Sequence, residues 1–155
     1  MSHSAPSSEL KKAIQEYLSE IPLTNCFGVS LTLKQNTSGV YLDDIRASQN
    51  LRHFLNLLNS EVYGKRFRRF GKKLNVIPSL ERSLSHRLHY HLILQNPYPE
   101  NPATFSRLVE ALWSKTQFGY VQSHIDQQID QGWTHYITKF KTASDGIDWE
   151  NYHWN

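Results

Sequence analysis

Residues 88–94 constrain the fold of this chain most strongly. Large apolar side chains occupy every even-numbered position of this stretch, from Leu88 to Leu94, and His89 and His91 stand between the first three of them. This period of two predicts a β-strand with one face in the core. The two histidines then share the opposite face, about 6–7 Å apart along the strand. Two imidazoles held side by side on a rigid strand provide half of a metal site.

The preceding segment, residues 74–81, supplies a third ligand. A hairpin folded about Ser85 places Glu81 opposite His89, so that Glu81, His89 and His91 share one face. Two imidazoles and a carboxylate with open coordination positions are typical of a catalytic divalent-metal site, and we predict Mn²⁺ or Mg²⁺ ahead of Zn²⁺. Ordinary exposed strand histidines would give the same His-x-His spacing, but the matching carboxylate favours the metal site.

Length and composition indicate a single globular domain. The chain has 155 residues, 39% of them hydrophobic and 12% aromatic, which is enough to bury a sizeable core. We assign residues 1–7 to a disordered leader and residues 8–155 to the domain. The net charge is only +3, which permits an anionic partner without requiring one.

The cysteine content and the absence of long apolar runs indicate where the chain acts. One cysteine, Cys26, rules out an internal disulfide and fits a reducing compartment. A Cys–His nucleophilic pair built on Cys26 stays open, although a small buried residue is the commoner reason for a cysteine at the start of an apolar strand. Residues 1–8 lack the apolar core of a signal peptide, and no apolar run approaches a membrane-spanning length. We therefore predict a cytoplasmic protein with no membrane partner.

Apolar periodicity predicts both helices and strands along the rest of the chain. Several antiparallel strands with helices between them indicate an α+β fold, in which a central antiparallel sheet has helices packed mainly on one face. The uncovered face carries Ser30, Thr32 and Lys34 beside the three metal ligands, and we expect a substrate to lie there. Residues 145–155 form an aromatic tail, which we expect to be a packed cover. The predicted helices span residues 8–21, 48–63, 101–116 and 127–142, and the predicted strands span residues 25–35, 74–81, 88–94 and 118–125, with a turn at 36–39.

A basic segment, residues 65–73, links the second predicted helix to the metal hairpin. Six of its nine residues are lysine or arginine, and Phe67 and Phe70 are interleaved with them. Guanidinium groups suit phosphates and aromatic rings stack on unpaired bases, so this segment is predicted to bind DNA. The alternative is a solvated turn whose phenylalanines dip into the core. The predicted DNA-binding residues are Lys65, Arg66, Arg68, Arg69, Lys72 and Lys73 in this segment, with Thr32 and Lys34 on the sheet.

A tyrosine and a lysine share one face of the last predicted helix. Tyr136 and Lys139 are three residues apart, and Gly132 lies one turn before Tyr136, where it leaves space for a bulky substrate. A tyrosine is rarely ionised at neutral pH, and a nearby ammonium favours the phenolate and neutralises charge on a phosphate. A half-buried tyrosine beside a solvated lysine would give the same spacing. His135 is turned about 100° away on a helix and is not assigned as the base.

The order of these motifs resembles the HUH endonucleases, with the closest resemblance to replication initiators of rolling-circle plasmids, single-stranded DNA viruses and filamentous phages. Residues 27–33 look like the first motif of that family, a strand of the central sheet. The resemblance implies a ferredoxin-like palm that binds a divalent ion and cuts one DNA strand, keeping the 5′ end on tyrosine. By the resemblance, Glu81, His89 and His91 are the metal ligands, Tyr136 is the nucleophile and Lys139 assists it.

The resemblance also implies partners and a biological role. The partner is single-stranded or hairpin origin DNA, and the role is initiation of rolling-circle replication. A helicase would be a separate protein, because the chain has no GxxxxGK[ST] phosphate-binding loop. Two residues depart from the family pattern: Tyr90 stands where a smaller apolar residue is commoner, and Phe140 stands where several relatives carry a second tyrosine. A single-tyrosine transposase is the first alternative, and a non-catalytic metal-stabilised nucleic-acid-binding module is the second.

Overall fold

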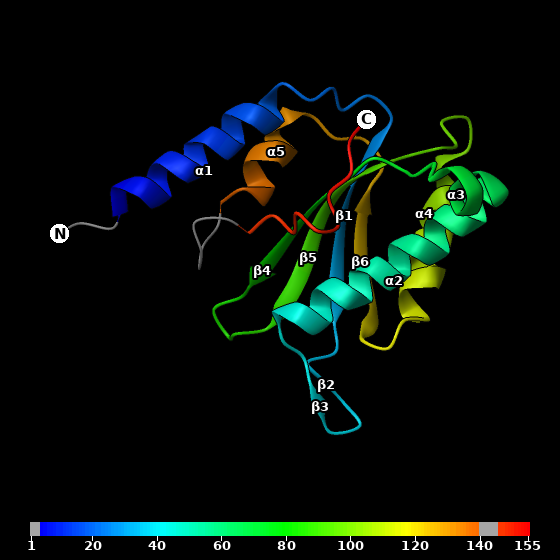
Figure 1. Ribbon diagram of the computed structural model, residues 1–155, viewed down its shortest axis with the longest axis horizontal. Helices are drawn as coiled ribbons and strands as arrows, with labels where there is room; N and C mark the ends of the chain where they lie inside the picture. Colours follow the sequence, from blue (N-terminus) through cyan, green and yellow to red (C-terminus); the bar gives the residue numbers. More distant parts are fainter. Residues whose placement is uncertain (1–3, 140–145) are drawn as a thin grey trace.

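The computed structural model describes residues 4–139 and 146–155 (Figure 1). Its centre is a four-stranded antiparallel sheet with the strand order β4-β5-β1-β6. This arrangement confirms the predicted α+β class and the central antiparallel sheet. The elements are α1 (Ser4–Ser19), β1 (Cys26–Leu33), β2 (Asn36–Thr37), β3 (Val40–Tyr41), α2 (Asp44–Tyr63), α3 (Lys65–Phe70), β4 (Val76–Arg82), β5 (Leu88–Gln95), α4 (Pro102–Ser114), β6 (Gly119–Asp126) and α5 (Gln131–Ile137).

Helices α2 and α4 cover one face of the sheet and enclose the main core. The even-numbered residues of β5 and the odd-numbered residues of β1 point into this core, as the period of two requires. Phe54 of α2 meets Trp113 of α4 edge-to-face, with 5.3 Å between the ring centroids. The indole N–H of Trp113 donates to the backbone carbonyl of Thr32 at 2.8 Å, which satisfies its polar group and fixes α4 to β1.

The other face of the sheet is covered in part, by α1, α5 and the C-terminal segment (residues 146–155), where the sequence analysis expected an uncovered face (Figure 1). Ile77 and Ile93 explain the difference. Both are fully buried on this face, where they pack in one cluster with Leu18 of α1 and Ile137 of α5. Ile77 interrupts the alternation of β4 because it supports this second, smaller core.

The C-terminal segment pairs with the outer edge of β4. The backbone N–H groups of Val76 and His153 each donate to the other residue's carbonyl, at 2.7 and 3.0 Å. Farther along the same edge, Asp148 donates its N–H to the carbonyl of Pro78. The aromatic tail is thus a cover, as predicted. It occupies a strand edge that would otherwise be free to pair with another chain.

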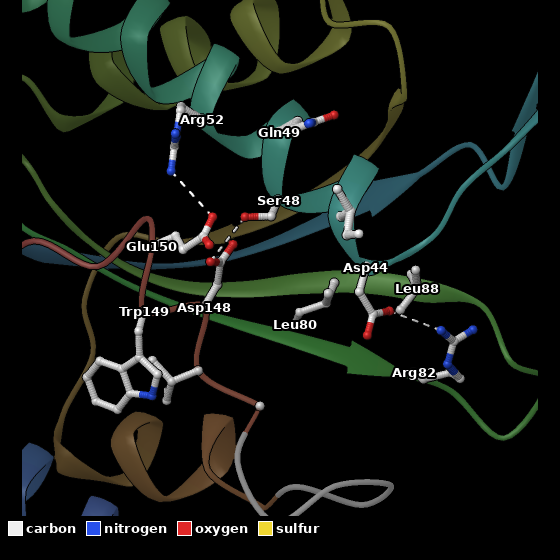
Figure 2. A pocket seen from close by; sticks show the side chains of 13 residues that line it. Asp44, Ser48, Gln49, Arg52, Leu80, Arg82, Leu88, Asp148, Trp149 and Glu150 are labelled. Carbon is white, nitrogen blue, oxygen red and sulfur yellow. Dashed lines mark hydrogen bonds and ion pairs between the residues drawn. The ribbon is translucent and has the colours of Figure 1, made fainter.

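A polar network fastens this segment to the core. The buried hydroxyl of Tyr90 donates to Asp148 at 2.7 Å, and the same carboxylate accepts from Asn151 at 2.8 Å and from Ser48 of α2 at 3.2 Å. Figure 2 shows Ser48 and Asp148 facing each other. Burial, and then the neighbouring Asp148 carboxylate, raise the pKa of Tyr90 above its ordinary value. Tyr90 therefore remains a hydroxyl donor.

Several element boundaries differ from the sequence analysis. Helix α1 begins at Ser4, so it takes up residues 4–7, which were assigned to the leader. Helix α2 begins four residues before Ser48, because Asp43 accepts the backbone N–H of Arg46 and caps it. The predicted turn at 36–39 lies within the short β2–β3 hairpin.

The last helix, α5, is shorter at both ends than the predicted 127–142: it begins at Gln131 and ends at Ile137. Lys139 therefore lies just beyond it and does not share a helix face with Tyr136. Strand β6 continues to Asp126, and Asp130 then caps α5 by accepting the N–H of Gly132. Gly132 is therefore at the start of the helix. Residues 140–142 of the predicted helix lie outside the described residues. Within the described part of the chain, no helix is long and apolar enough to cross a membrane.

Tyr90→Phe should lower the free energy of unfolding by about 1.5–3 kcal/mol, the usual contribution of a hydrogen bond to a charged group. The substitution removes one oxygen and keeps the packed ring. Urea denaturation measures the effect, with Tyr41→Phe as the control, since Tyr41 is 72% exposed. Equal stabilities of the two variants would show that the Asp148 network does not stabilise the fold.

Candidate metal centre

The β4–β5 hairpin places the three predicted metal ligands together. Glu81 is the direct cross-strand partner of His89, and Ser79 is the partner of His91. The loop between the strands is tight: the N–H of Ser83 donates to the carbonyl of Arg87 at 2.9 Å, and His86 adopts a positive φ of 62°. The predicted pairing of Glu81 opposite His89 is confirmed.

The ligand atoms converge on one point. Glu81 Oε2 lies 3.2 Å from His91 Nε2 and 3.6 Å from His89 Nε2, and one ligand atom from each of the three residues lies within 4.8 Å of the others. Three atoms that each lie about 2.1 Å from one ion are at most about 4.2 Å apart, so the cluster needs only small side-chain movements to close around an ion. Two imidazole nitrogens and a carboxylate oxygen suit a divalent ion.

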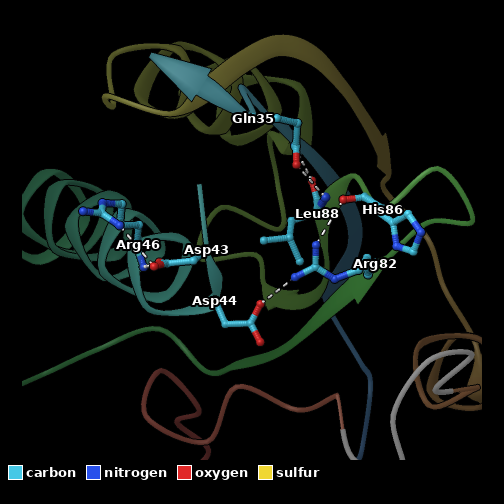
Figure 3. A network of polar contacts seen from close by, with 7 residues as sticks. All are labelled: Gln35, Asp43, Asp44, Arg46, Arg82, His86 and Leu88. Atoms are coloured by element: carbon cyan, nitrogen blue, oxygen red, sulfur yellow. Dashed lines mark hydrogen bonds and ion pairs between the residues drawn. The ribbon is translucent and has the colours of Figure 1, made fainter. Parts of the chain in front are cut away.

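Neighbouring residues orient the ligands. His91 is buried, and its Nδ1 lies 3.0 Å from Ser30 Oγ on β1. A neutral His91 that binds a metal through Nε2 carries its proton on Nδ1. The Nδ1–H group then donates a hydrogen bond to Ser30 Oγ. Gln35 holds the residue before His89: its side-chain amide bonds both the N–H and the carbonyl of Leu88, at 2.9 and 3.0 Å (Figure 3). The supporting roles of Ser30 and Gln35 were not predicted from the sequence.

Helix α5 packs across the strands that carry the ligands. Ser79 Oγ donates to the carbonyl of Ile137 at 2.8 Å, which fastens the end of the helix to β4. At the other end, the indole of Trp133 lies directly on Gly28 of β1. A Cβ at position 28 would stand 2.4 Å from a ring carbon of Trp133, so only glycine permits this contact.

The packing of α5 brings Tyr136 to the metal ligands. The ring of Tyr136 meets the ring of His91 with 5.1 Å between centroids, and Trp133 contacts Tyr136 at 5.4 Å. Tyr136 remains 45% exposed. Lys139 Nζ lies 5.2 Å from the centroid of the Tyr136 ring. The structure thus unites Tyr136, Lys139 and the metal ligands, which are far apart in the sequence.

The structure does not bring the basic segment to this site. Residues 65–70 form helix α3, which packs against α2 beyond the opposite face of the sheet (Figure 1). Arg66 and Lys72 stand over the ring of Tyr63, at 5.4 and 5.3 Å from its centroid, and Arg68 bonds Ser60 of α2. All six basic side chains of the segment are exposed.

Of the two other predicted DNA-binding residues, Thr32 of β1 lies on the face of the metal ligands. Thr32 is the direct partner of His89 and donates its hydroxyl to the carbonyl of Gln122. Lys34 is exposed just after the end of β1, with its N–H bonded to the carbonyl of Phe118.

The Cys26 alternative receives no support. The Cys26 side chain is buried in the smaller core, and burial raises the pKa of its thiol to about 11. The thiolate is the nucleophilic form, so this cysteine is a poor nucleophile at neutral pH.

A cavity of about 590 Å³ lies on the far side of the β4–β5 hairpin, between α2 and the C-terminal segment (Figure 2). Its two arginines pair with carboxylates of the same cavity: Arg82 with Asp44 at 3.1 Å, and Arg52 with Glu150 at 3.5 Å. These are exposed pairs that contribute little stability. The cavity lies behind the metal ligands and takes no part in the candidate site.

Comparison with known proteins adds no identification: no family model, curated protein or solved structure matches the chain.

Replacing both histidines, His89→Ala with His91→Ala, should abolish binding of Mn²⁺ and leave the fold intact, because neither side chain belongs to a hydrophobic core. Isothermal calorimetry measures the binding. His53→Ala is the control, since His53 is exposed on α2. Lowering the pH should weaken binding to the wild-type chain, because protons compete with the metal for the imidazole nitrogens. An unchanged titration in the double variant would contradict the assignment.

Gly28→Ala should displace Trp133 and lower the free energy of unfolding by about 1–3 kcal/mol, the usual cost of overpacking. Metal affinity should be kept, because the ligands belong to β4 and β5. Combining Gly28→Ala with Trp133→Leu should cost less than the sum of the two single changes, since the smaller side chain makes room for the added methyl group. Strict additivity in thermal or urea unfolding would mean that the two residues do not compete for space.

Proposed function

We propose that this chain is a metal-dependent enzyme that nicks and rejoins one strand of DNA through a 5′-phosphotyrosine intermediate. The observation that carries the proposal is the position of Tyr136, whose ring lies 5.1 Å from the ring of the metal-ligand candidate His91. Half-burial alone would also fit a tyrosine that merely packs; what favours a catalytic role is that the 45% exposed Tyr136 stands directly beside a cluster of metal-ligand candidates. This arrangement disfavours the non-catalytic binding module.

The reaction is a transesterification. The phenolic oxygen of Tyr136 attacks the scissile phosphorus, the new bond joins that oxygen to phosphorus, and the bond from phosphorus to the 3′ oxygen breaks. The phenolic proton passes to solvent, and the departing 3′ oxygen takes a proton from water. The ammonium of Lys139 stabilises the negative charge near the ring. Glu81, His89 and His91 would hold a divalent ion, which would supply positive charge to the phosphate oxygens. Rejoining is the same exchange in reverse, with a 3′ hydroxyl as the nucleophile.

The nucleic acid contacts both sides of the molecule in this proposal. The cleaved strand lies on the metal face, near Thr32 and Lys34. The six exposed cations of the basic segment bind phosphates elsewhere on the same DNA, because α3 stands beyond the opposite face. Two of them, Arg66 and Lys72, are held against the ring of Tyr63, which lowers the entropy lost on binding.

We infer the biological role from the resemblance to replication initiators. The protein would nick single-stranded or hairpin origin DNA and start rolling-circle replication of a plasmid, phage or virus, with a separate helicase, in the cytoplasm. A single-tyrosine transposase performs the same chemistry at transposon ends. The DNA sequence that the protein cleaves distinguishes the two roles.

Tyr136→Phe should form no covalent adduct with DNA while it keeps the fold and the metal affinity, because the change removes only the attacking oxygen. The assay incubates the protein and Mn²⁺ with a labelled random single-stranded library and looks for a denaturation-resistant protein–DNA band. Tyr120→Phe is the matched control, since Tyr120 is 40% exposed. Lys139→Ala should slow the adduct by about 10²–10³, the usual loss for one charge-stabilising group.

Mass spectrometry of the trapped adduct locates the bond. A nucleotide on any residue other than Tyr136, or cleavage at the wild-type rate by Tyr136→Phe, would overturn the proposed nucleophile. Cleavage without an adduct would point to hydrolysis by water at the metal.

A further inference from the structure

The residues beside the metal ligands form a row across the sheet. Ser30 of β1 is the direct partner of His91 on β5 and also of His124 on β6. Directly paired residues point to the same face, so His124 shares the face of the metal ligands. Two strand spacings separate His124 from His91, which is about 10 Å.

His124 belongs to a second polar pair on this face. Its Nε2 lies 3.2 Å from an oxygen of Asp126, and Asp126 is the direct partner of Gly28. The side chains are 71% and 42% exposed. They stand next to the point where Trp133 covers Gly28, so the pair lies beside the helix that carries Tyr136.

Ser30 of β1 stands between His91 and His124 and is partly exposed, whereas Gly28, the partner of Asp126, is covered by Trp133. On the other side, α5 covers Ser79 and the C-terminal segment occupies the outer edge of β4. Between the ligands and β6, the partly exposed side chains of β1 on this face, Ser30 and Thr32, are small. A DNA strand whose phosphate sits at the metal ligands therefore continues across β1 to β6. The 10 Å span corresponds to about three nucleotides at 3.4 Å each in a stacked strand.

We propose that His124 and Asp126 form a nucleobase subsite, which binds an amino-bearing base of the cleaved strand a few nucleotides from the scissile phosphate. The subsite rests on the proposed function, because it takes its ligand from the strand at the metal centre. His124 fixes the Asp126 carboxylate, and the second carboxylate oxygen accepts an N–H from the exocyclic amine of adenine, cytosine or guanine.

The chemistry of the pair favours a base over a phosphate. Strand β6 contains no lysine or arginine, and the carboxylate of Asp126 repels a phosphate. Thymine is disfavoured as well. The one N–H donor on its pairing edge is flanked by two carbonyl oxygens, which repel a carboxylate. The subsite therefore discriminates cytosine and adenine from thymine.

The test measures binding of the full chain to labelled oligo-dC, oligo-dA and oligo-dT by fluorescence anisotropy, with Mn²⁺ at pH 8. The wild-type chain should bind oligo-dC and oligo-dA at least about 5-fold more tightly than oligo-dT, the lower end for one good base contact. Asp126→Asn should erase the preference, because an amide also donates to the thymine carbonyls. Glu110→Gln makes the same chemical change on an exposed position of α4 and should keep the preference.

The adduct assay separates this inference from the proposed function. If the wild-type chain and Asp126→Asn both form adducts, with the same base preferences, the result would support nicking and overturn the subsite. Lost discrimination in Asp126→Asn, with no adduct from any sequence, would support the subsite and overturn nicking. Equal binding of all three oligonucleotides by the wild-type chain would overturn the subsite directly.

Discussion

The pairing register of β4 and β5 is the constraint on which the candidate site depends. A slip of one residue would turn Glu81 into the core and Leu80 onto the metal face, because side chains alternate along a strand. The main core fixes the register from one side, since Tyr90 and Leu92 are fully buried there. The tight loop between Ser83 and Arg87 fixes it from the end. Hydrophobic burial on one face of the sheet thus positions the candidate metal ligands on the other face.

Helix α5 depends on the same sheet for its position. It has only seven residues, too few to be stable alone, so its place comes from tertiary contacts. Trp133 seats on Gly28 at one end, and Ser79 bonds Ile137 at the other. These two contacts determine where the Tyr136 ring stands relative to His91. The position of the proposed nucleophile therefore depends on Gly28 of β1 and Ser79 of β4.

The sequence predicted the parts of the site that follow from local periodicity. Alternation in β5 separated His89 and His91 from Tyr90, and hairpin symmetry paired Glu81 with His89. The contact of α5 with β1 was not predictable, because a glycine in a strand does not specify which ring will cover it. The position of the basic segment was missed for a related reason: a run of charges predicts exposure, but the direction in which α3 leaves α2 depends on Gly64 and on packing.

Along the β4–β5 hairpin, residues that stabilise the fold alternate with residues that face the candidate metal site. Tyr90 supports the fold through Asp148, while the histidines on either side of it face the proposed reaction. The division is incomplete at Ile77 and Ile93, which extend the apolar surface onto the metal face and hold α1 and α5 there. That exception makes the site asymmetric. Helices and the C-terminal segment close the β4 side, and Trp133 closes β1 at Gly28. A long, flexible substrate can therefore continue toward β6 past Ser30, which is partly exposed.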